Sequence, residues 1–176
     1  YLETFLYDET VYTNDLEPDK VDKIFSNELI KEYVLADQIT VTLNESSLTI
    51  IALDSSEFSK VFNTLDHSTS KPKTLQKDSI MITDKLADLH EIEIGDTITV
   101  LDGDTKEYKL TVTDIVKNYM EHYIYIDKSN IENYNPNTVF LKTKEKTKKQ
   151  QENLTKELLT NDEVINVIHT ETLIDS

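Results

Sequence analysis

The chain contains no cysteine and no arginine, although it is 176 residues long. Without cysteine it cannot form disulfides, use a thiol in catalysis, or hold metals and iron–sulfur clusters through thiolates. Arginine is the residue best shaped for paired hydrogen bonds to phosphates and bases, and the formal net charge of −16 repels phosphate backbones. We therefore expect no nucleic-acid partner.

Glycine is almost as scarce, because Gly95 and Gly103 are the only two in the sequence. Walker-A loops, dinucleotide-binding fingerprints and the nucleophile elbow of α/β-hydrolases each need two or more closely spaced glycines. These two are too far apart to supply any of them. The common nucleotide-binding and α/β-hydrolase mechanisms are therefore excluded.

Long apolar runs are also missing. A membrane-spanning helix needs roughly 18 to 20 apolar residues, and no stretch approaches that length. We also expect no signal peptide directly before Tyr1. The length fits one compact unit with an insertion, and because the sequence begins and ends within a pattern of elements, we expect a domain excised from a longer protein.

Hydrophobic periodicity predicts both strands and helices, hence an α+β domain. Strands are expected at 5–7, 33–43, 48–53, 80–82, 92–100, 108–112, 119–126, 139–141 and 164–168. Helices are expected at 18–30, 58–65, 84–89, 127–131 and 146–160. The polar stretches 8–15 and 66–78 are expected to be loops.

Some side-chain directions follow from the same periodicity. In strand 33–43 the residues of one parity are expected on one buried face, namely Tyr33, Leu35, Ile39, Val41 and Leu43. In the helix after Thr83, Leu86, Ala87 and Leu89 are expected to point inward. In the strand 108–112 every second residue is apolar, and the next position in that alternation is occupied by Asp114. This predicts a β-bulge near Thr113 and Asp114.

The chain begins and ends with a strand–helix–strand pattern. This predicts a ferredoxin-like split βαβ sheet built from both chain ends, of the porter-like kind, formed by residues 1–53 plus 137–176. Residues 54–136 are then expected to form an inserted β-rich lobe.

Candidate metal ligands are few. Glu121 and His122 are adjacent, but neighbouring residues on a strand face opposite ways, and a zinc ion needs three or four ligands. The favoured alternative to a metal site is that His122 is packed or hydrogen-bonded within the fold. Asp102, Asp104 and Glu107 resemble a calcium loop that lacks a third early ligand and a correctly placed glycine, and a tight hairpin turn explains them. We assign no catalytic, cofactor-binding or metal-binding residue.

An aromatic strand provides the candidate partner-contact residues, which are Tyr119, Met120, His122, Tyr123 and Tyr125. Tyrosine and methionine suit contact surfaces, although an aromatic strand can equally form part of a core. A second unusual stretch is the lysine run Lys142, Lys144, Lys146, Lys148 and Lys149. It is either a solvated helix face or a surface that docks on an anionic wall polymer or on headgroups.

The stretch 80–100, IMITDKLADLHEIEIGDTITV, resembles part of the extracytoplasmic domains of ABC transporter permeases of the FtsX-like and MacB-like type. The shared features are a strand, TDKLA opening a short helix, and an IGDTITV turn and strand. The similarity continues through DGDTKEYKLTV at 102–112 and NYMEHYIYID at 118–127. At the end of the chain, KELLTNDEVINV resembles the last helix and strand, whereas residues 1–66 match mainly in the order of elements. Met120 and Glu121 depart from the pattern, where a smaller residue or glycine is expected.

The resemblance implies a non-enzymatic domain on the extracellular face of the cell membrane, inserted between transmembrane helices of the same permease. Such a domain needs no cofactor and transmits ATP-driven conformational change from a cytoplasmic ATP-binding subunit to an extracellular peptide, lipoprotein or cell-wall enzyme. A second permease copy is a further candidate partner. The lysine- and isoleucine-rich, arginine-free composition indicates a Gram-positive source.

Two alternatives remain open at the level of sequence. The first is a free-standing cell-surface binding or adhesion domain, which would have an anchoring signal at one end only. The second is a carboxylate-dependent hydrolase, which would place two carboxylates roughly 5 to 9.5 Å apart in an acidic cleft.

Overall fold

The computed structural model describes residues 4–103, 106–118 and 121–171. Within them the chain forms strands β1 (Glu9–Thr13), β2 (Ile30–Leu43), β3 (Ser46–Leu53), β4 (Ile80–Thr83), β5 (Thr97–Asp102), β6 (Lys106–Thr111), β7 (Asp114–Val116), β8 (Tyr123–Asp127), β9 (Thr138–Thr143) and β10 (Val164–His169). The α-helices are α1 (Pro18–Phe25), α2 (Phe58–Val61), α3 (Asp84–His90) and α4 (Lys148–Leu158), with 3-10 helices at Ser55–Glu57 and Lys128–Asn130. The prediction of an α+β domain is confirmed.

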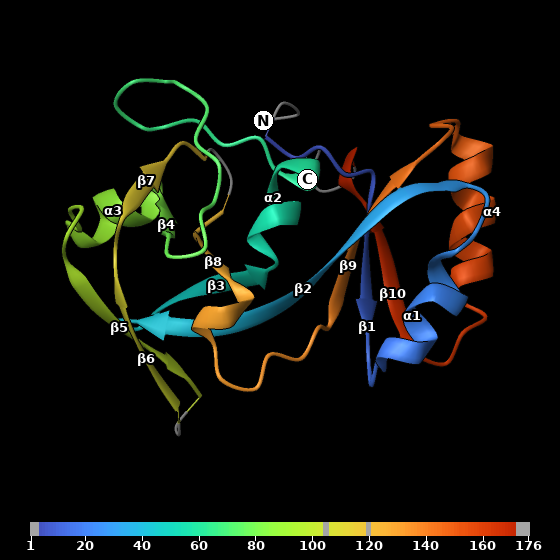
Figure 1. The fold of residues 1–176 in the computed structure, drawn as a ribbon, viewed down its shortest axis with the longest axis horizontal. Coiled ribbons are helices and arrows are strands. Elements are labelled where there is room, and N and C mark those ends of the chain that lie inside the picture. The colour runs from blue at the N-terminus through green and yellow to red at the C-terminus, as the bar shows by residue number, and fades with distance from the viewer. Residues whose placement is uncertain (1–3, 104–105, 119–120, 172–176) are drawn as a thin grey trace.

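One twisted sheet runs through the whole molecule (Figure 1). Its strand order is β10-β1-β9-β2-β3-β8-β4-β7, and the hairpin β5–β6 joins it at one point, where Leu101 pairs with Thr42. Strand β2 pairs with β9 along its first part and with β3 from Ala36 onward. A single strand therefore belongs to both halves of the sheet.

The terminal half of the sheet consists of β10, β1, β9 and the first part of β2, and all of its neighbouring strands are antiparallel. Helix α1 connects β1 to β2, and α4 connects β9 to β10. Both helices pack on the same face, on the right in Figure 1. The apolar cluster between them and the sheet includes Val11, Phe25, Leu141, Leu154 and Leu158.

The distal half consists of the second part of β2 with β3, β8, β4 and β7, the hairpin β5–β6 and helix α3. Strand β8 pairs in parallel with β3, and β7 pairs in parallel with β4. The core of this half combines residues of β2 and β3 with residues from positions 80–131, including Val41, Ile50, Ile82, Val100 and Ile124. The predicted boundary at residue 53 therefore runs through a shared core, and the division into two subdomains stays a prediction.

An aromatic cluster covers the opposite face of the sheet at its centre. Phe62 lies in the middle of it, with ring centroids 5.2 Å from Phe58, 5.0 Å from Tyr125, 5.3 Å from Phe140 and 5.6 Å from Tyr7. Helix α2 and the segment before β1 supply the covering residues. Val34 and Ala36 of β2 face this cluster, so β2 is buried on both faces in its first part.

The parity predicted for β2 is confirmed. Tyr33 and Leu35 pack on the core beneath the helices, and Ile39, Val41 and Leu43 pack on the core of the distal half. The alternation identified this face correctly because its residues from Tyr33 to Leu43 are apolar except for Asp37.

The prediction for the first strand was wrong. The strand lies at Glu9–Thr13, inside the stretch expected to be a loop, whereas Phe5 forms only an isolated bridge with Phe62. The polar residues Glu9, Thr10 and Thr13 are buried in β1. Polarity indicated a loop because the partners of these side chains lie far away in the sequence.

The predicted bulge near Thr113 and Asp114 was also wrong. After β6 the chain leaves the hairpin and forms a new strand, β7, parallel to β4. The Thr113 side chain fixes this crossing, because its hydroxyl accepts a 2.8 Å hydrogen bond from the Ile80 N–H. The interruption of the alternation therefore marks a change of partner strand.

One apolar side chain lies outside the core, contrary to prediction. Leu89 is 58% exposed at the end of α3, whereas Leu86 and Ala87 are buried as expected. The predicted helices 18–30 and 146–160 are shorter than expected and end at Phe25 and Leu158.

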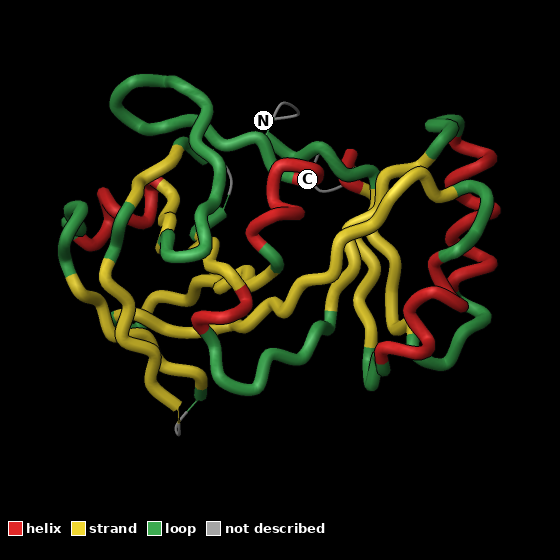
Figure 2. The backbone as a smooth tube through the Cα atoms, in the orientation of Figure 1, coloured by secondary structure: helices red, strands yellow, loops and turns green. Residues whose placement is uncertain are grey.

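The two described ends of the chain lie side by side (Figure 2). Strands β1 and β10 are paired, the Thr170 N–H donates to the Asp8 carbonyl at 3.0 Å, and the Thr170 hydroxyl donates to the Tyr7 carbonyl at 2.7 Å. None of the helices in the described ranges is both long and apolar enough to cross a lipid bilayer.

Candidate partner-contact site

The structure separates the five residues predicted to contact a partner. Tyr119 and Met120 lie outside the described residues. His122 and Tyr123 are half-buried, at the start of β8. Tyr125 has no exposed surface and belongs to the aromatic cluster, so its side chain is part of the core. The role of the other residues in partner contact stays a prediction.

Tyr125 is an aromatic core residue, and its hydroxyl is buried. Its ring lies 5.3 Å from Phe58 and 5.0 Å from Phe62. Burial raises the pKa of Tyr125 well above its ordinary value, while the side chain of Asn118 acts in the opposite direction. The hydroxyl therefore stays protonated at any physiological pH.

Tyr123 lies at the margin of the same cluster. Its ring is 5.8 Å from that of Tyr125, and its N–H donates to the Thr83 hydroxyl at 3.2 Å. Thr83 is the N-cap residue of α3, and its side chain makes no capping hydrogen bond to that helix. Burial raises the pKa of Tyr123, and the nearby Glu121 carboxylate and Tyr12 hydroxyl raise it further. Tyr12 and Tyr123 are thus close in space although they are far apart in the sequence.

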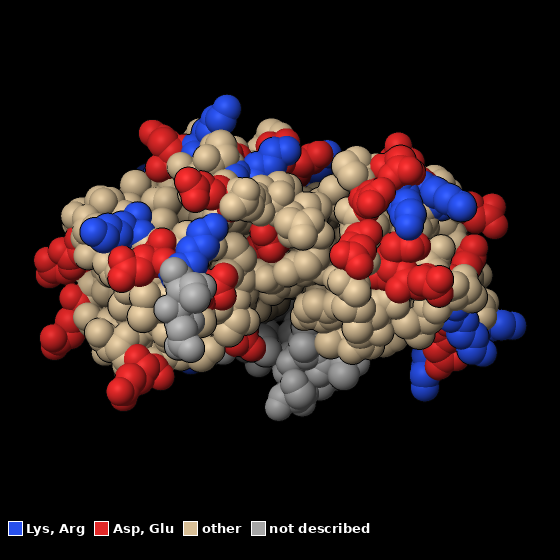
Figure 3. All heavy atoms as spheres, turned by 90° about the horizontal axis from the view of Figure 1, so that it is seen from below, with Lys and Arg blue, Asp and Glu red and all other residues tan. Residues whose placement is uncertain are grey.

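A shallow, uncharged hollow of about 380 Å³ opens beside these tyrosines on the face of the sheet that α1 and α4 leave free. It is lined by Tyr12, Thr13, Gln38, Thr40, Thr49, Asn137, Thr138 and Ile165. In the space-filling view the surface between the two halves is mostly uncharged, and acidic side chains gather over the right-hand half (Figure 3). The hollow is a neutral region in a strongly acidic molecule.

Several polar groups of the hollow are already paired with one another. The Asn137 side chain accepts from the Gln38 N–H at 2.9 Å and donates to the Gln38 carbonyl at 2.9 Å. The Gln38 amide donates to the Thr138 hydroxyl at 3.3 Å, and that hydroxyl donates to Asn137 Oδ1 at 2.8 Å. These bonds hold β2 against β9, and the Tyr12 side chain is hydrogen-bonded to Gln38 as well. None of Tyr12, Gln38 and Asn137 was predicted to belong to a site; for Tyr12 the reason is that its strand was expected to be a loop.

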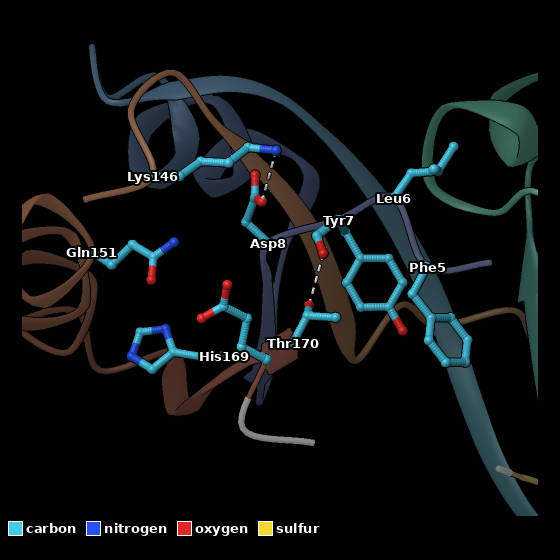
Figure 4. A pocket seen from close by; sticks show the side chains of 9 residues that line it. Phe5, Leu6, Tyr7, Asp8, Lys146, Gln151, His169 and Thr170 are labelled. Carbon is cyan, nitrogen blue, oxygen red and sulfur yellow. Dashed lines mark hydrogen bonds and ion pairs between the residues drawn. The ribbon is translucent and has the colours of Figure 1, made fainter. Parts of the chain in front are cut away.

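A second pocket, of about 250 Å³, lies where the two chain ends meet. Figure 4 shows Lys146 pointing to Asp8, with Gln151 and His169 beneath them and Phe5 and Tyr7 on the other side. The Lys146 ammonium is 3.3 Å from the Asp8 carboxylate. The same carboxylate accepts from the Thr143 N–H at 2.8 Å, so Asp8 joins the N-terminal segment to the start of the lysine run.

Behind this pocket lies a buried carboxylate. Glu9 has no exposed surface, and its Oε1 is 2.6 Å from Nδ1 of His169, whose side chain is 34% exposed. Burial raises the pKa of Glu9 from 4.5 to about 7; the hydrogen bond and charge of His169 lower it, and Asp8 raises it.

A carboxylate behind a histidine is also an arrangement used in acid–base catalysis. In that arrangement the histidine activates a neighbouring hydroxyl. Here the hydroxyl of Thr170, which lines the pocket, already donates its proton to the Tyr7 carbonyl. We therefore interpret Glu9 and His169 as a tie between β1 and β10, which pair at these two residues.

The candidate ligand clusters from the sequence do not assemble. Asp102 ends β5 opposite Lys106, as expected for a hairpin, and Asp104 lies outside the described residues. Within the described parts of the chain, no three histidine, aspartate or glutamate side chains are grouped so that they could hold a metal ion.

Comparison with known proteins gives a likeness of fold. The sequence matches no protein-family model, and a search of curated proteins finds no match either. Among solved structures, the extracellular domain of the noncanonic ABC-type transporter YknZ from Gram-positive bacteria has a TM-score of 0.51 at 16% identity, over 90% of this chain and 99% of that chain.

Two further structures resemble the chain more weakly. A domain of a protein described as a permease from Porphyromonas gingivalis has a TM-score of 0.43 at 10% identity, over 90% of this chain and 82% of that one. A protein described as a lipoprotein from Bacillus anthracis has a TM-score of 0.42 at 9% identity, over 92% and 96%. The resemblance predicted from the stretch 80–127 is confirmed at the level of fold: the chain has the fold of the extracellular domain of an ABC-type transporter.

Proposed function

We propose that this chain is the non-enzymatic extracellular domain of an ABC transporter permease and that it transmits ATP-driven conformational change to an extracellular substrate or partner. The observation that carries the proposal is the pairing of β1 with β10, which brings both described ends to one edge of the molecule. A domain inserted between two transmembrane helices needs its ends close together, because both connect to the same membrane. The likeness to the extracellular domain of YknZ supports this reading.

We propose further that the terminal half is a ferredoxin-like split βαβ unit that lies next to the membrane. The order β10-β1-β9-β2, antiparallel throughout with one helix in each βαβ connection, supports this proposal. Residues 54–136 then project away from the membrane as the inserted lobe.

The proposed partners follow from this placement. Transmembrane helices of the same permease adjoin the chain ends, and a cytoplasmic ATP-binding subunit acts on them indirectly. His122 and Tyr123, beside the uncharged hollow, are the proposed contact with an extracellular peptide, lipoprotein or cell-wall enzyme. A second permease copy is a further proposed partner, at the membrane of a Gram-positive cell.

The flanking sequence in the full-length gene provides the first test. We expect a membrane-spanning helix on each side of the chain. A gene with such a helix on one side only, or on neither, would exclude the proposal and favour a free-standing surface domain.

The second test uses the absence of cysteine from the chain. In the full-length protein, Glu107→Cys places a thiol at an exposed position of β6, and Val100→Cys places one at a fully buried position of β5. A membrane-impermeant thiol reagent should label position 107 in intact cells, with position 100 as the unlabelled control. Labelling of position 107 only after lysis would show that the domain is not extracellular.

The proposed contact surface can be tested by photo-crosslinking. A photoreactive phenylalanine analogue at position 122 should form a covalent adduct with an extracellular protein, and the same analogue at Glu17, exposed before α1, should form none. Equal adducts at both positions, or an adduct at 17 alone, would place the contact elsewhere.

A further inference from the structure

The lysine run is the main basic segment of an acidic protein. Residues 142–149 contain five lysines and one glutamate, whereas the whole chain has a net charge of −16. The segment begins in β9 and ends in the first turn of α4. The fold therefore concentrates positive charge at one place on its surface.

Only two of these lysines are used by the fold. Lys142 lies 3.9 Å from Glu32, and Lys146 lies 3.3 Å from Asp8. The side chains of Lys144, Lys148 and Lys149 are exposed and form no ion pair within the described part of the chain. We call these three residues the lysine patch.

Helix stability does not explain the lysine patch. Positive side chains in the first turn of a helix oppose the helix dipole, and acidic ones are favoured there. The first turn of α4 has no acidic residue, whereas α1 has Asp19 and α3 has Asp84 in theirs. Lys148 and Lys149 are thus slightly unfavourable for the helix that contains them.

The lysine patch lies on the side of the molecule from which both chain ends leave. The ion pair between Lys146 and Asp8, and the hydrogen bond from the Thr170 N–H to the Asp8 carbonyl, connect the run to both terminal segments. In Figure 1 the connection from β9 to α4 and the two ends all lie along the upper side. Seen from below, on the opposite side, the right-hand half shows clustered acidic side chains (Figure 3).

We propose that the lysine patch contacts anionic phospholipid headgroups of the membrane next to the chain ends. This inference rests on the proposed function, which puts that side of the molecule against the membrane. Each lysine near an anionic bilayer surface is worth about 1 kcal/mol, so three contribute roughly a 100-fold increase in affinity. The attraction acts within about one Debye length, about 10 Å at 0.1 M salt, so acidic side chains beyond that distance are screened, whereas Glu145, next to Lys144, offsets part of the positive charge.

Vesicle co-sedimentation of the 176-residue chain tests the proposal. The triple variant Lys144→Gln, Lys148→Gln and Lys149→Gln is compared with a control triple of the same charge, Lys23→Gln, Lys77→Gln and Lys109→Gln, at exposed positions on other elements. We expect binding to phosphatidylglycerol vesicles but not to phosphatidylcholine vesicles, weakening as salt is raised. The patch variant should bind roughly 100-fold more weakly, and the control should bind as tightly as the parent chain.

Three results would overturn the proposal. They are equal binding by the patch and control variants, equal binding to neutral and anionic vesicles, and no binding of the parent chain to anionic vesicles even at low salt. An anionic wall polymer that binds the patch more tightly than the vesicles do would assign the patch to the wall. Melting temperatures of both triple variants within about 2 °C of the parent would show that folding is not the cause.

This test is separate from that of the proposed function. Flanking helices without vesicle binding would remove only the headgroup contact. Vesicle binding without flanking helices would leave the lysine patch as a membrane-binding surface and remove the permease assignment.

Discussion

Replacing Glu9 with glutamine should make the stability of the fold less dependent on pH. Glu9 is fully buried in β1, with His169 Nδ1 2.6 Å from its Oε1. Burial, opposed by the hydrogen bond and charge of His169, raises the pKa of Glu9 from 4.5 in the ordinary state to about 7 in the folded protein. The folded state therefore favours the protonated carboxyl.

The sign and size of the effect follow from these two values. Because the folded pKa is the higher one, the stability that this group contributes is fully present below about pH 4.5 and is lost as the pH rises through about 7. One pH unit of pKa difference corresponds to about 1.4 kcal/mol, so the loss amounts to roughly 3 kcal/mol. Glutamine has nearly the same shape, keeps an acceptor for His169 and does not ionise.

Urea denaturation at pH 5 and pH 8 measures the difference. We expect the Glu9→Gln variant and the parent to have similar free energies of unfolding at pH 5, and the variant to be more stable by roughly 3 kcal/mol at pH 8. Glu107→Gln is the control, since it removes one negative charge from an exposed position. A variant that is no more stable than the parent at pH 8, or a gain matched by the Glu107 control, would refute the reasoning.

Three further predictions concern particular contacts. Glu91→Gly should raise the melting temperature by a few degrees, since Glu91 ends α3 in the left-handed region at φ 54°, which costs a non-glycine residue about 1 kcal/mol; a lower melting temperature would contradict this. Asp127→Ala should lower the free energy of unfolding, measured by urea denaturation, by about 2 to 3 kcal/mol, because the buried carboxylate accepts from the Ser55 N–H at 2.8 Å and from the Ser129 N–H at 3.0 Å. A loss under about 0.5 kcal/mol would show that these hydrogen bonds are dispensable. Phe62→Ala should lower the free energy of unfolding by about 3 to 5 kcal/mol, because Phe62 touches five aromatic neighbours, Phe5, Tyr7, Phe58, Tyr125 and Phe140. The control Leu89→Ala, at an exposed position, should lower it little. Similar losses for the two variants would argue against the aromatic cluster.

Local patterns predicted the elements whose stability is local. Strand β2 was identified because the residues of one parity from Tyr33 to Leu43 are apolar except for Asp37. Strand β1 was missed because Glu9 is stabilised by His169, 160 residues away. Strand β7 was missed because its partner β4 lies more than thirty residues earlier. Pairing over such distances leaves no periodic signal in the sequence.

The candidate site was predictable only in part. Tyr123 and Tyr125 have the same parity on β8, so the sequence could not tell that one lies at the margin of the aromatic cluster and the other inside it. Their depth depends on α2 and on the segment before β1, which cover Tyr125 more completely. Tyr12 could not be assigned to the site from the sequence, because it lies in β1, which was predicted to be a loop.

The length of β2 has a mechanical consequence. Fourteen residues of extended chain span about 45 Å, and this one strand runs from the antiparallel sheet at the chain ends to the hairpin at the far end. Under the proposed function, β2 would therefore be the covalent connection through which a displacement of the terminal strands reaches the hairpin. Cutting the chain into two independently folding fragments would sever that strand and deprive each fragment of part of its interior.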